Sequence, residues 1–423
     1  MVVMLLFFVM SLAAAYASRN LIFEQRTSAN QYRSTQSFEA AEAGIEWALA
    51  MLNGGRITAN CTPTADTAFN SFRDRYVLTD LTTGVLNSRP HATTAGEKLW
   101  AACSWDGTNW QCRCPTGSLS VADLPAGRAA FAVRFADQIT LPGVVRLEVN
   151  GCNAYDGGDV RGCLRYVELT ADPDVRCQST ACTMLSVYSG AKAPPMAAVT
   201  ARQDVGGTGL LVYNQDMSTA GVTVHAGGFN NAGAWTLSSL PGTPPALSMR
   251  AGDTDLLTLF DDADGCVLCT FTSLFGVRPG TYRRMMGTMV IDCTTVCSAA
   301  NVNAALGTTR GRVVWLSGAG GLTLDDPANV IGAANDPVVL VIDGPITITS
   351  TATTATTTAR IHGLVYASLA TVNGGEIRGA LVSATTVTGS GVGKVVYDGA
   401  ALQRLQRTSG TFVSIPGSWR DFP

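Results

Sequence analysis

The first fifty residues constrain the architecture of this chain more than any other feature. No charged side chain precedes Arg19, and the apolar run before it is rich in Leu, Met, Phe and Ala. A helix of this length spans roughly 27 Å, about the hydrocarbon thickness of a bilayer. The run continues with neither Pro nor Gly before Gly44. A secretory signal would end in a cleavage site and a break, so we expect this run to be kept as a helix.

A second, amphipathic segment follows the apolar run. Apolar residues recur there at spacings of three and four, which is typical of one helical face. The sequence "NGG" at 53–55 is a helix stop signal. We therefore predict one helix over residues 1–53, roughly 80 Å long. Its predicted packing residues in a membrane or filament are Met1, Leu5, Phe8, Met10, Ala14, Phe38, Ala41, Ile45 and Leu49.

Such a helix has two interpretations. It can be a single-pass anchor with a helical stalk, or a pilin-type helix that leaves the bilayer to pack in a filament core. The segments "VVMLLFFVMSLAAA" and "RNLIFEQRTSANQYRSTQSFEAAEAGIEWAL" resemble the N-terminal domain of PilX-type type IV pilus assembly proteins, in which "FEAAEAG" is a hallmark. The resemblance covers about the first 55 residues, and it favours the pilin interpretation.

The sequence departs from the pilin pattern in two places. A basic leader is absent, so Met1 is either the first mature residue or a shifted start. No acid precedes Glu24, whereas major pilins carry a glutamate near the start of the mature helix. The tip pseudopilin of type II secretion also lacks this acid. The resemblance therefore implies a large minor pilin at or near the tip. It also implies other pilins and the inner-membrane assembly machinery as partners, and a location first in the inner membrane and then in the extracellular pilus.

Composition limits the remaining possibilities. The chain has 423 residues, a net charge of −3 and only 14% charged residues, with no basic block, so nucleic acid is not an expected partner. Gly, Thr, Ala and Val dominate after residue 55, which indicates β structure with glycine turns. The predicted fold class is α+β.

Twelve cysteines favour disulfides in an exported chain. The alternative is zinc bound at "CVLC" (266–269) or "CRC" (112–114), but the three histidines are far from both in sequence. Cys152 with Cys163 is the best single predicted pair. The candidates are Cys61, Cys103, Cys112, Cys114, Cys152, Cys163, Cys177, Cys182, Cys266, Cys269, Cys293 and Cys297.

The rest of the chain divides at "SGAKAPPM" (189–196). Residues 54–195 contain alternating strands and predict a pilin-like antiparallel β domain on the helix. Residues 196–398 predict a β-solenoid-like domain, or a β-sandwich, with a partly helical, disulfide-bonded insertion at 240–310 that projects from its side. Residues 399–423 are a predicted C-terminal tail.

A short repeat carries the solenoid interpretation. "IHGLVYA" begins at Ile361 and "IRGALVS" at Ile377, so Gly363 and Gly379 are sixteen residues apart. Stacked rungs of strand and turn produce such a repeat, and each rung buries its apolar side against the next. We therefore expect Val365 and Leu381 to be buried at related positions.

No catalytic motif occurs in the sequence, and no cofactor is expected. Asp325, Asp326 and Asp343 are the only acids considered for glycan cleavage, and their sequences are ordinary turns. Asp262 and Asp264 lie in "DDADG", which resembles a calcium loop only faintly. Trp100, Trp105 and Trp110 form either a disulfide-bonded cluster or an exposed binding patch.

Three functions stay open from the sequence. The first is a minor pilin that initiates or caps the pilus and presents a β-rich body at the tip. The second is a tip adhesin whose body binds a surface or glycan. The third is a membrane-anchored periplasmic enzyme acting on polysaccharide, which would need a cleft with converging carboxylates.

Overall fold

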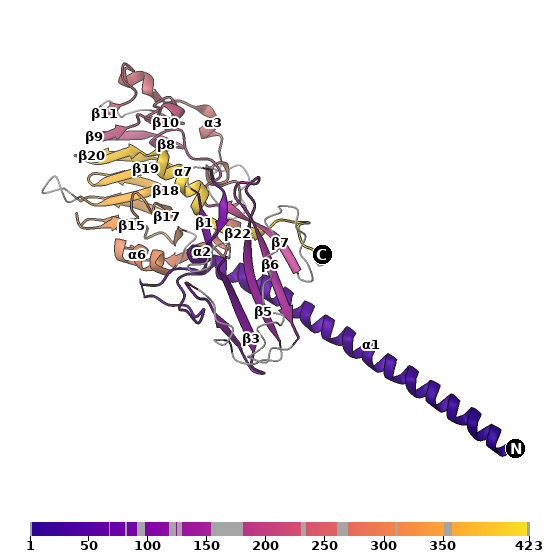
Figure 1. Cartoon of the computed structure of the whole chain (residues 1–423). Helices are drawn as coiled ribbons and strands as arrows, with labels where there is room; N and C mark the ends of the chain where they lie inside the picture. Colours follow the sequence, from indigo (N-terminus) through magenta and orange to yellow (C-terminus); the bar gives the residue numbers. More distant parts are fainter. Residues whose placement is uncertain are drawn as a thin grey trace.

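The chain folds into one long helix and two β units (Figure 1). The computed structural model describes residues 2–66, 68–80, 83–90, 98–117, 124, 129–153, 181–229, 234–259, 270–308, 312–350 and 358–420. Helix α1 runs unbroken over Val2–Asn53. It ends where predicted, at the "NGG" sequence, and only its last third touches the rest of the molecule.

The first β unit, here called the antiparallel unit, packs on the C-terminal part of α1. Its six-stranded sheet has the order β22-β7-β6-β5-β3-β4, and every pairing in it is antiparallel. Phe131, Val133 and Val149 point from the sheet into a core shared with Ala48 and Leu52 of the helix. The strands are β3 (Trp100–Trp105), β4 (Trp110–Arg113), β5 (Ala130–Asp137), β6 (Val144–Cys152), β7 (Ala181–Ser189) and β22 (Gly410–Ser414). A short helix α2 (Phe72–Tyr76) and a two-stranded pair, β1 (Val77–Thr79) with β2 (Leu86–Ser88), complete the unit.

The last strand of this sheet comes from the far end of the chain. The structure differs here from the predicted tail at 399–423, because this segment forms helix α7 (Gly399–Thr408) and then β22. Phe412 of β22 is 1% exposed and lies in the core beneath α1. Burying Phe412 and pairing β22 with the edge strand β7 favour this placement over exposure to solvent.

The second β unit, here called the parallel unit, is one continuous sheet of 14 strands. Every pairing between its named strands is parallel, unlike the antiparallel pairing of the β-sandwich alternative. Its strands are β8 (Val199–Ala201), β9 (Val205–Tyr213), β10 (Val224–Ala226), β11 (Ala234–Ser238), β12 (Met249–Arg250), β13 (Thr288–Asp292), β14 (Val313–Ser317), β15 (Leu322–Leu324), β16 (Val330–Ile331), β17 (Val338–Ile348), β18 (Arg360–Val372), β19 (Glu376–Ser383), β20 (Val387–Ser390) and β21 (Lys394–Tyr397). Two 3₁₀ turns, Met217–Thr219 and Pro245–Ser248, lie between strands of this unit.

The predicted sixteen-residue repeat is a pair of stacked rungs. Gly363 lies opposite Gly379 in the β18–β19 pairing, and Val365 lies opposite Leu381. Both apolar side chains are fully buried in the same interior cluster, as the repeat predicts. Both glycines have positive φ, and a Cβ on Gly379 would lie 1.9 Å from the carbonyl oxygen of Gly363. The rungs therefore approach each other more closely than any side chain would allow.

The order of the rungs in space differs from their order in the sequence. Leu381 of β19 pairs with Val199 of β8, so the first rungs of the unit stack on its last ones. The stack runs from β13 through β14, β17, β18 and β19 to β8, β10 and β12. Figure 1 shows its middle part, from β17 through β18 and β19 to β8 and β10. The chain between β12 and β13 must therefore return along the whole stack.

That return segment does not simply project, as predicted for residues 240–310. Strands β12 and β13 belong to the sheet itself. Phe271 of α4 (Thr270–Phe275) and Tyr282 of α5 (Pro279–Arg283) are buried on the outer face of the sheet, together with Leu402 of α7. Helix α6 (Ala299–Thr308) places Val302 in the interior cluster, and α3 (Thr254–Leu257) is a single exposed turn. Aromatic side chains at helical spacing cover a sheet face because exposing them would be costly.

Disulfides join cysteines in both units. The described bonds are Cys61–Cys114, Cys103–Cys112 and Cys293–Cys297. Cys114 thus pairs across 53 residues and not within its local cluster, and the zinc alternative at "CRC" is wrong because both of its cysteines are bonded. Cys152 and Cys182 are also disulfide-bonded. Cys163, Cys177, Cys266 and Cys269 lie outside the described residues, so the Cys152–Cys163 pair stays a prediction.

Candidate assembly interface

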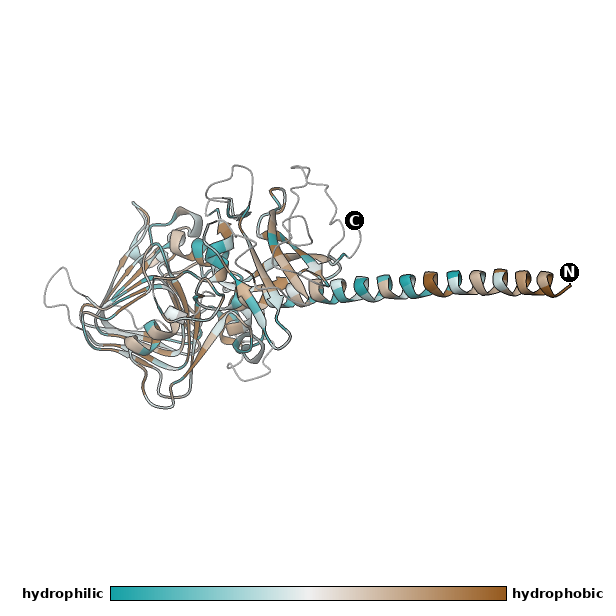
Figure 2. Ribbon diagram, turned by 60° about the horizontal axis from the view of Figure 1, so that its bottom comes forward, coloured by the Kyte–Doolittle hydropathy of each residue, from teal (hydrophilic) through white to brown (hydrophobic). Residues whose placement is uncertain are grey.

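The first two thirds of α1 form an exposed helix segment, defined here as residues 2–35. Every side chain in it is exposed, including Leu5, Phe8 and Met10 at 65–69%. Its N-terminal half is apolar and its second half polar, as the colour change along the helix in Figure 2 shows. Exposed apolar surface of this extent marks a membrane or protein contact. The helix is long and apolar enough to cross a membrane.

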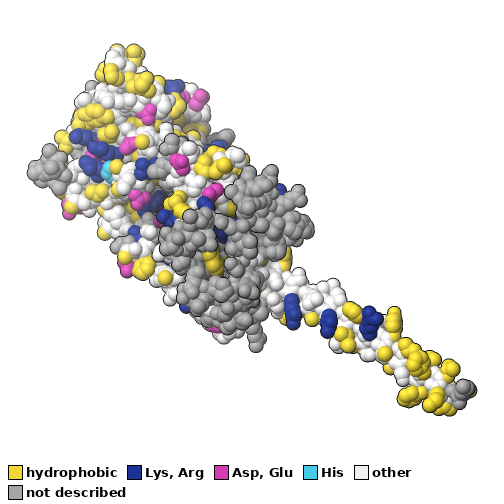
Figure 3. Space-filling model, viewed as in Figure 1, with side chains coloured by type: hydrophobic (Ala, Val, Ile, Leu, Met, Phe, Trp, Pro, Cys, Tyr) yellow, Lys and Arg dark blue, Asp and Glu magenta, His cyan; other side chains and the backbone are white. Residues whose placement is uncertain are grey.

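Charges on the exposed helix segment begin only beyond the apolar half. Arg19, Arg26 and Arg33 are its basic residues, and Glu24 is its only acid. Figure 3 shows these basic side chains midway along the free helix, after a yellow apolar end. Ala14 lies in the apolar part and is exposed. Met1 lies outside the described residues.

The remaining third of α1 is held by close backbone packing. Gly44 faces Phe131 and Val149, and a Cβ there would lie 2.5 Å from Val149 Cγ1. From the sheet side, a Cβ on Gly151 would lie 2.0 Å from the carbonyl oxygen of Ser37. The two glycines thus let helix and sheet approach each other at two points, which fixes the direction in which the free segment leaves the body.

A polar contact fixes the end of the helix. Asn53 is 7% exposed, and its Nδ2 donates to the Phe412 carbonyl oxygen at 3.0 Å. Its Oδ1 accepts from the Phe412 backbone N–H at 2.7 Å. The last turn of α1 is therefore bound to β22 by two buried hydrogen bonds, each of which would be costly to leave unmade.

The predicted packing residues divide between two environments. Leu5, Phe8, Met10 and Ala14 are exposed and available to other helices or lipid. Ala41 and Ile45 are buried in the core of the antiparallel unit, so their predicted role in filament packing is corrected to intramolecular packing.

Two more of those residues also contact the chain's own body. Leu49 packs against the same core, and Phe38 meets Trp419 edge-to-face with ring centroids 6.0 Å apart. The apolar stripe from Phe38 to Leu49 is therefore the docking face of the sheet. The periodicity identifies an apolar face, but it does not identify the partner.

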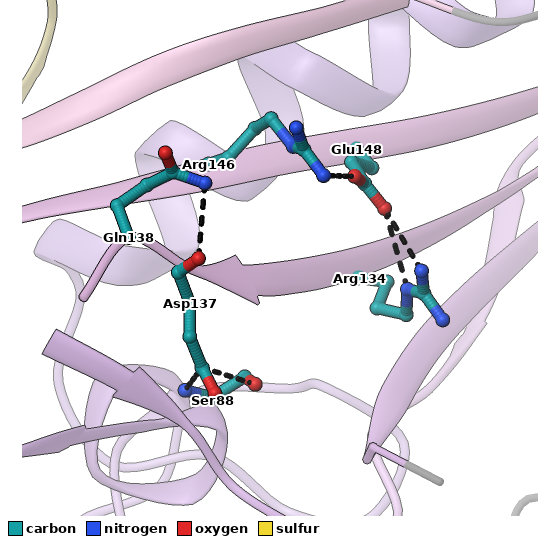
Figure 4. A network of polar contacts seen from close by, with 6 residues as sticks. All are labelled: Ser88, Arg134, Asp137, Gln138, Arg146 and Glu148. Atoms are coloured by element: carbon teal, nitrogen blue, oxygen red, sulfur yellow. Dashed lines mark hydrogen bonds and ion pairs between the residues drawn. The ribbon is translucent and has the colours of Figure 1, made fainter. Parts of the chain in front are cut away.

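Part of the sheet face away from the helix carries an ion-paired network (Figure 4). Glu148 is 4% exposed and forms two ion pairs. Arg146 Nη2 lies 2.7 Å from Glu148 Oε1, and Arg134 Nη2 lies 3.1 Å from Glu148 Oε2. The triad satisfies a buried carboxylate on strands β5 and β6.

Asp137 at the end of β5 is held in a second polar cluster. It accepts hydrogen bonds from the backbone N–H and hydroxyl of Ser88, and an ion pair from Lys98 Nζ at 3.0 Å. Partial burial alone would raise the pKa of Asp137, but these donors outweigh it and lower the pKa. Figure 4 also shows Gln138 donating to the Asp137 carbonyl oxygen. The ionised carboxylate of Asp137 therefore connects β5 to β2 through its hydrogen bonds with Ser88.

The three acids that the sequence offers for glycan cleavage, Asp325, Asp326 and Asp343, are all exposed. Asp326 Oδ1 accepts from the Ala328 backbone N–H at 2.8 Å, which is an ordinary turn contact. Asp343 lies 3.9 Å from Arg283 on the exposed side of β17. Among the described residues no group of three or more metal-ligating side chains occurs. Asp262 and Asp264 lie outside the described residues.

Two of the three tryptophans pack on each other, although Trp110 remains 37% exposed. Trp105 and Trp110 face each other across the β3–β4 hairpin with ring centroids 5.6 Å apart. Trp110 also meets Phe131 at 4.8 Å. The Cys103–Cys112 disulfide joins the same two strands. The packing and the disulfide fit the interpretation of a disulfide-bonded cluster, and the exposed part of Trp110 leaves the binding-patch interpretation open.

Sequence reasoning did not identify four residues that hold α1 on the sheet: Gly44, Gly151, Asn53 and Phe412. A glycine inside a strong helical pattern, such as Gly44, is a usable signal of close packing. Asn53 could be read only as part of the helix stop, because its partner lies at the opposite end of the chain.

Comparison with known proteins agrees with this geometry at the N-terminus. Residues 1–46 match the family model described as PilX N-terminal. No curated protein matches the chain. Among solved structures, the competence-associated pilin ComZ from Thermus thermophilus has 12% identity and a TM-score of 0.24, covering 92% of this chain and 97% of that one. At that score the whole-chain likeness carries no argument, so the similarity that the comparisons show is confined to the helix: the N-terminal 46 residues are similar to the N-terminal domain of PilX proteins.

Proposed function

We propose that this protein is a large minor subunit of a type IV pilus that initiates or caps the filament. The observation that carries the proposal is the exposed helix segment, whose apolar half has no partner within the described part of the chain. It first lies in the inner membrane, where the pilus assembly machinery engages it. It then packs among the helices of other pilins. The body reaches the extracellular surface with the filament.

The shape of the body supports a terminal position. The parallel unit extends from the antiparallel unit on the side away from the free helix (Figure 1). We further propose that this unit is a β-solenoid, in which parallel rungs such as those of Gly363 and Gly379 stack along one axis. Such a body is hard to repeat at every position of a thin filament and is accommodated more easily at its end.

The test is a pair of substitutions in the apolar half of the helix. Ser11, Ala13, Ala14, Ala15 and Ala17 are small and allow close helix approach. Ala14→Arg should block pilus incorporation, because an arginine in a lipid-like helix core costs about 2.5–3.5 kcal/mol or more. Ala14→Ser is the matched control and should be incorporated normally.

The readout is mass spectrometry of sheared pili, together with the unfolding transition of the body in detergent. Both variants should keep the wild-type transition, since Ala14 contacts no part of the body. Normal incorporation of Ala14→Arg would refute the helix-packing role. Recovery of the protein at a ratio near one per major pilin would refute the terminal position.

A second candidate function, tip adhesion, is favoured by one observation. Met217 and Phe229 are each 84% exposed and Leu247 is 75% exposed, all between strands β9 and β12. These strands form the end of the stack most distant from the free helix (Figure 1). Changing the three residues to Ser should abolish surface adherence and leave piliation intact. Unchanged adherence by such pili would remove this candidate.

A further inference from the structure

A cavity of about 290 Å³ lies between the two β units. Its wall from the antiparallel unit includes α2 and β1, and its opposite wall includes the turn before β17 and helix α7. The charged side chains that line it are Arg73, Arg89, Arg312, Arg404, Asp74 and Asp336. This cavity is called the arginine pocket. Its lining carries four arginines against two aspartates, a net formal charge of +2.

Arg73 is the most deeply placed of these cations. It is 5% exposed, and among the described residues no carboxylate lies within ion-pair distance of its guanidinium. Its Nη1 donates to the Gly410 carbonyl oxygen at 3.3 Å, and its guanidinium lies over the Phe412 ring at 4.7 Å. Its Nη2 is buried without a hydrogen-bond partner. Burial lowers the pKa of Arg73 to about 10 and outweighs the opposing effect of Asp74.

The other arginines are held in place mainly by carbonyl oxygens. Arg89 Nη2 donates to the Asp74 carbonyl at 2.8 Å, and Arg404 Nη1 donates to the Asn335 carbonyl at 2.7 Å. Carbonyl acceptors fix a guanidinium without neutralising it. Arg312 is the exception, because it forms an ion pair with Asp336.

Two further guanidinium nitrogens of the lining arginines have no hydrogen-bond partner among the described residues. The Nε atoms of Arg89 and Arg312 are also buried without partners. Buried donors are ordinarily paired, so Arg73, Arg89 and Arg312 each keep unused hydrogen-bonding capacity while lining the same cavity. Guanidinium groups match planar and tetrahedral oxyanions through paired N–H donors.

We infer that the arginine pocket binds a small oxyanion, a phosphate- or carboxylate-bearing molecule, between the two β units. The volume exceeds that of one water molecule several-fold and limits the ligand to a small one. Arg73 and Arg89 contact it from the antiparallel unit, and Arg312 and Arg404 from the opposite wall. The bound anion therefore bridges the units and stiffens the joint between them. This inference does not depend on a role in the pilus.

The test is calorimetric titration of the full chain in detergent at constant ionic strength. The probes are inorganic phosphate and citrate, which separate phosphate from carboxylate recognition. We expect saturable binding of at least one probe and a matching rise in melting temperature. Arg404→Gln, at the rim of the pocket, should weaken that binding about tenfold, the loss expected for one charge-assisted contact.

The control variant is Arg284→Gln. Arg284 is exposed and does not line the pocket, so this change removes the same charge elsewhere and should leave affinity within about twofold of wild type. The unliganded melting temperature of each variant establishes that it is folded. Arg73→Met is a second variant and should abolish binding if it folds. Failure of both probes to bind wild type, or equal affinity of wild type and folded Arg404→Gln, would overturn the inference.

Discussion

Replacing Gly379 with Ala would test the rung stacking directly. Gly379 has φ +134°, and its Cβ would lie 1.9 Å from the carbonyl oxygen of Gly363 in the neighbouring rung. The substitution therefore introduces two costs, a backbone conformation that Ala rarely adopts and a clash with rigid backbone. Gly242 is the matched control within the parallel unit, with φ +84° and no heavy atom within 4 Å of an added Cβ.

The two costs can be estimated separately. Positive-φ strain costs about 1–3 kcal/mol, and forcing one extra carbon into a packed interior costs about 1–3 kcal/mol. Gly379→Ala should therefore lose about 4 kcal/mol, whereas Gly242→Ala should lose about 1 kcal/mol from strain alone. For a unit of this size, these losses lower the melting temperature by roughly 8–16 °C and 2–4 °C respectively.

The assay is thermal unfolding of the full chain in detergent, followed by far-ultraviolet circular dichroism. The transition of the parallel unit should shift by the two different amounts, while the antiparallel unit keeps its disulfides and helix contact. Equal shifts for the two variants would refute the reasoning, because the close approach of the rungs would then contribute nothing beyond backbone strain.

Three other perturbations test separate contacts. Asn53→Ala removes both hydrogen bonds to Phe412 and should cost about 2–4 kcal/mol in denaturant unfolding, whereas exposed Asn60→Ala should cost little. Asp137→Asn should destabilise the antiparallel unit at pH 7. Because the folded pKa of Asp137 is lowered, the gap from wild type should close as pH falls below 3.8, and a gap that persists at lower pH would contradict the assignment. Removing the Cys61–Cys114 disulfide should cost about 4 kcal/mol and removing Cys293–Cys297 about 2 kcal/mol by loop length, and the reverse order would argue against this account.

Local patterns in the sequence predict the helix and the repeat. The α1 boundary follows from helix propensity, the absence of Pro and the "NGG" stop. The stacking of Gly363 on Gly379 follows from a fixed spacing. Both features depend on residues that are close together in the chain, which is why sequence reasoning finds them.

Features formed by distant segments are not predictable in the same way. The pairing of Cys61 with Cys114 and the placement of β22 beside β7 join segments with no shared motif. The packing of Phe271 and Tyr282 on the sheet could be inferred only as apolar helix faces without a named partner. The arginine pocket is a further case, because its arginines come from segments that meet only after both units have folded. The local sequence pattern predicts which face of an element is buried, whereas the segment that packs against this face is determined by the whole fold.

The chain order of the parallel unit links its completion to the docking of the helix. Strand β8 pairs in parallel with β19, which lies about 180 residues later in the chain, through Val199 and Leu381. This pairing therefore requires that β19 is already present. Helix α7 and β22 follow directly after the last rung, and α7 packs on the outer face of the sheet through Leu402 and Leu405. Strand β22 follows α7 in the chain, brings Phe412 to Asn53 and closes the antiparallel sheet. Such non-local contacts form late, since their loop entropy must be overcome before they stabilise the fold. The last turn of α1 therefore gains its two hydrogen bonds to β22 only once the C-terminal segment that follows the final strand of the parallel unit is in place.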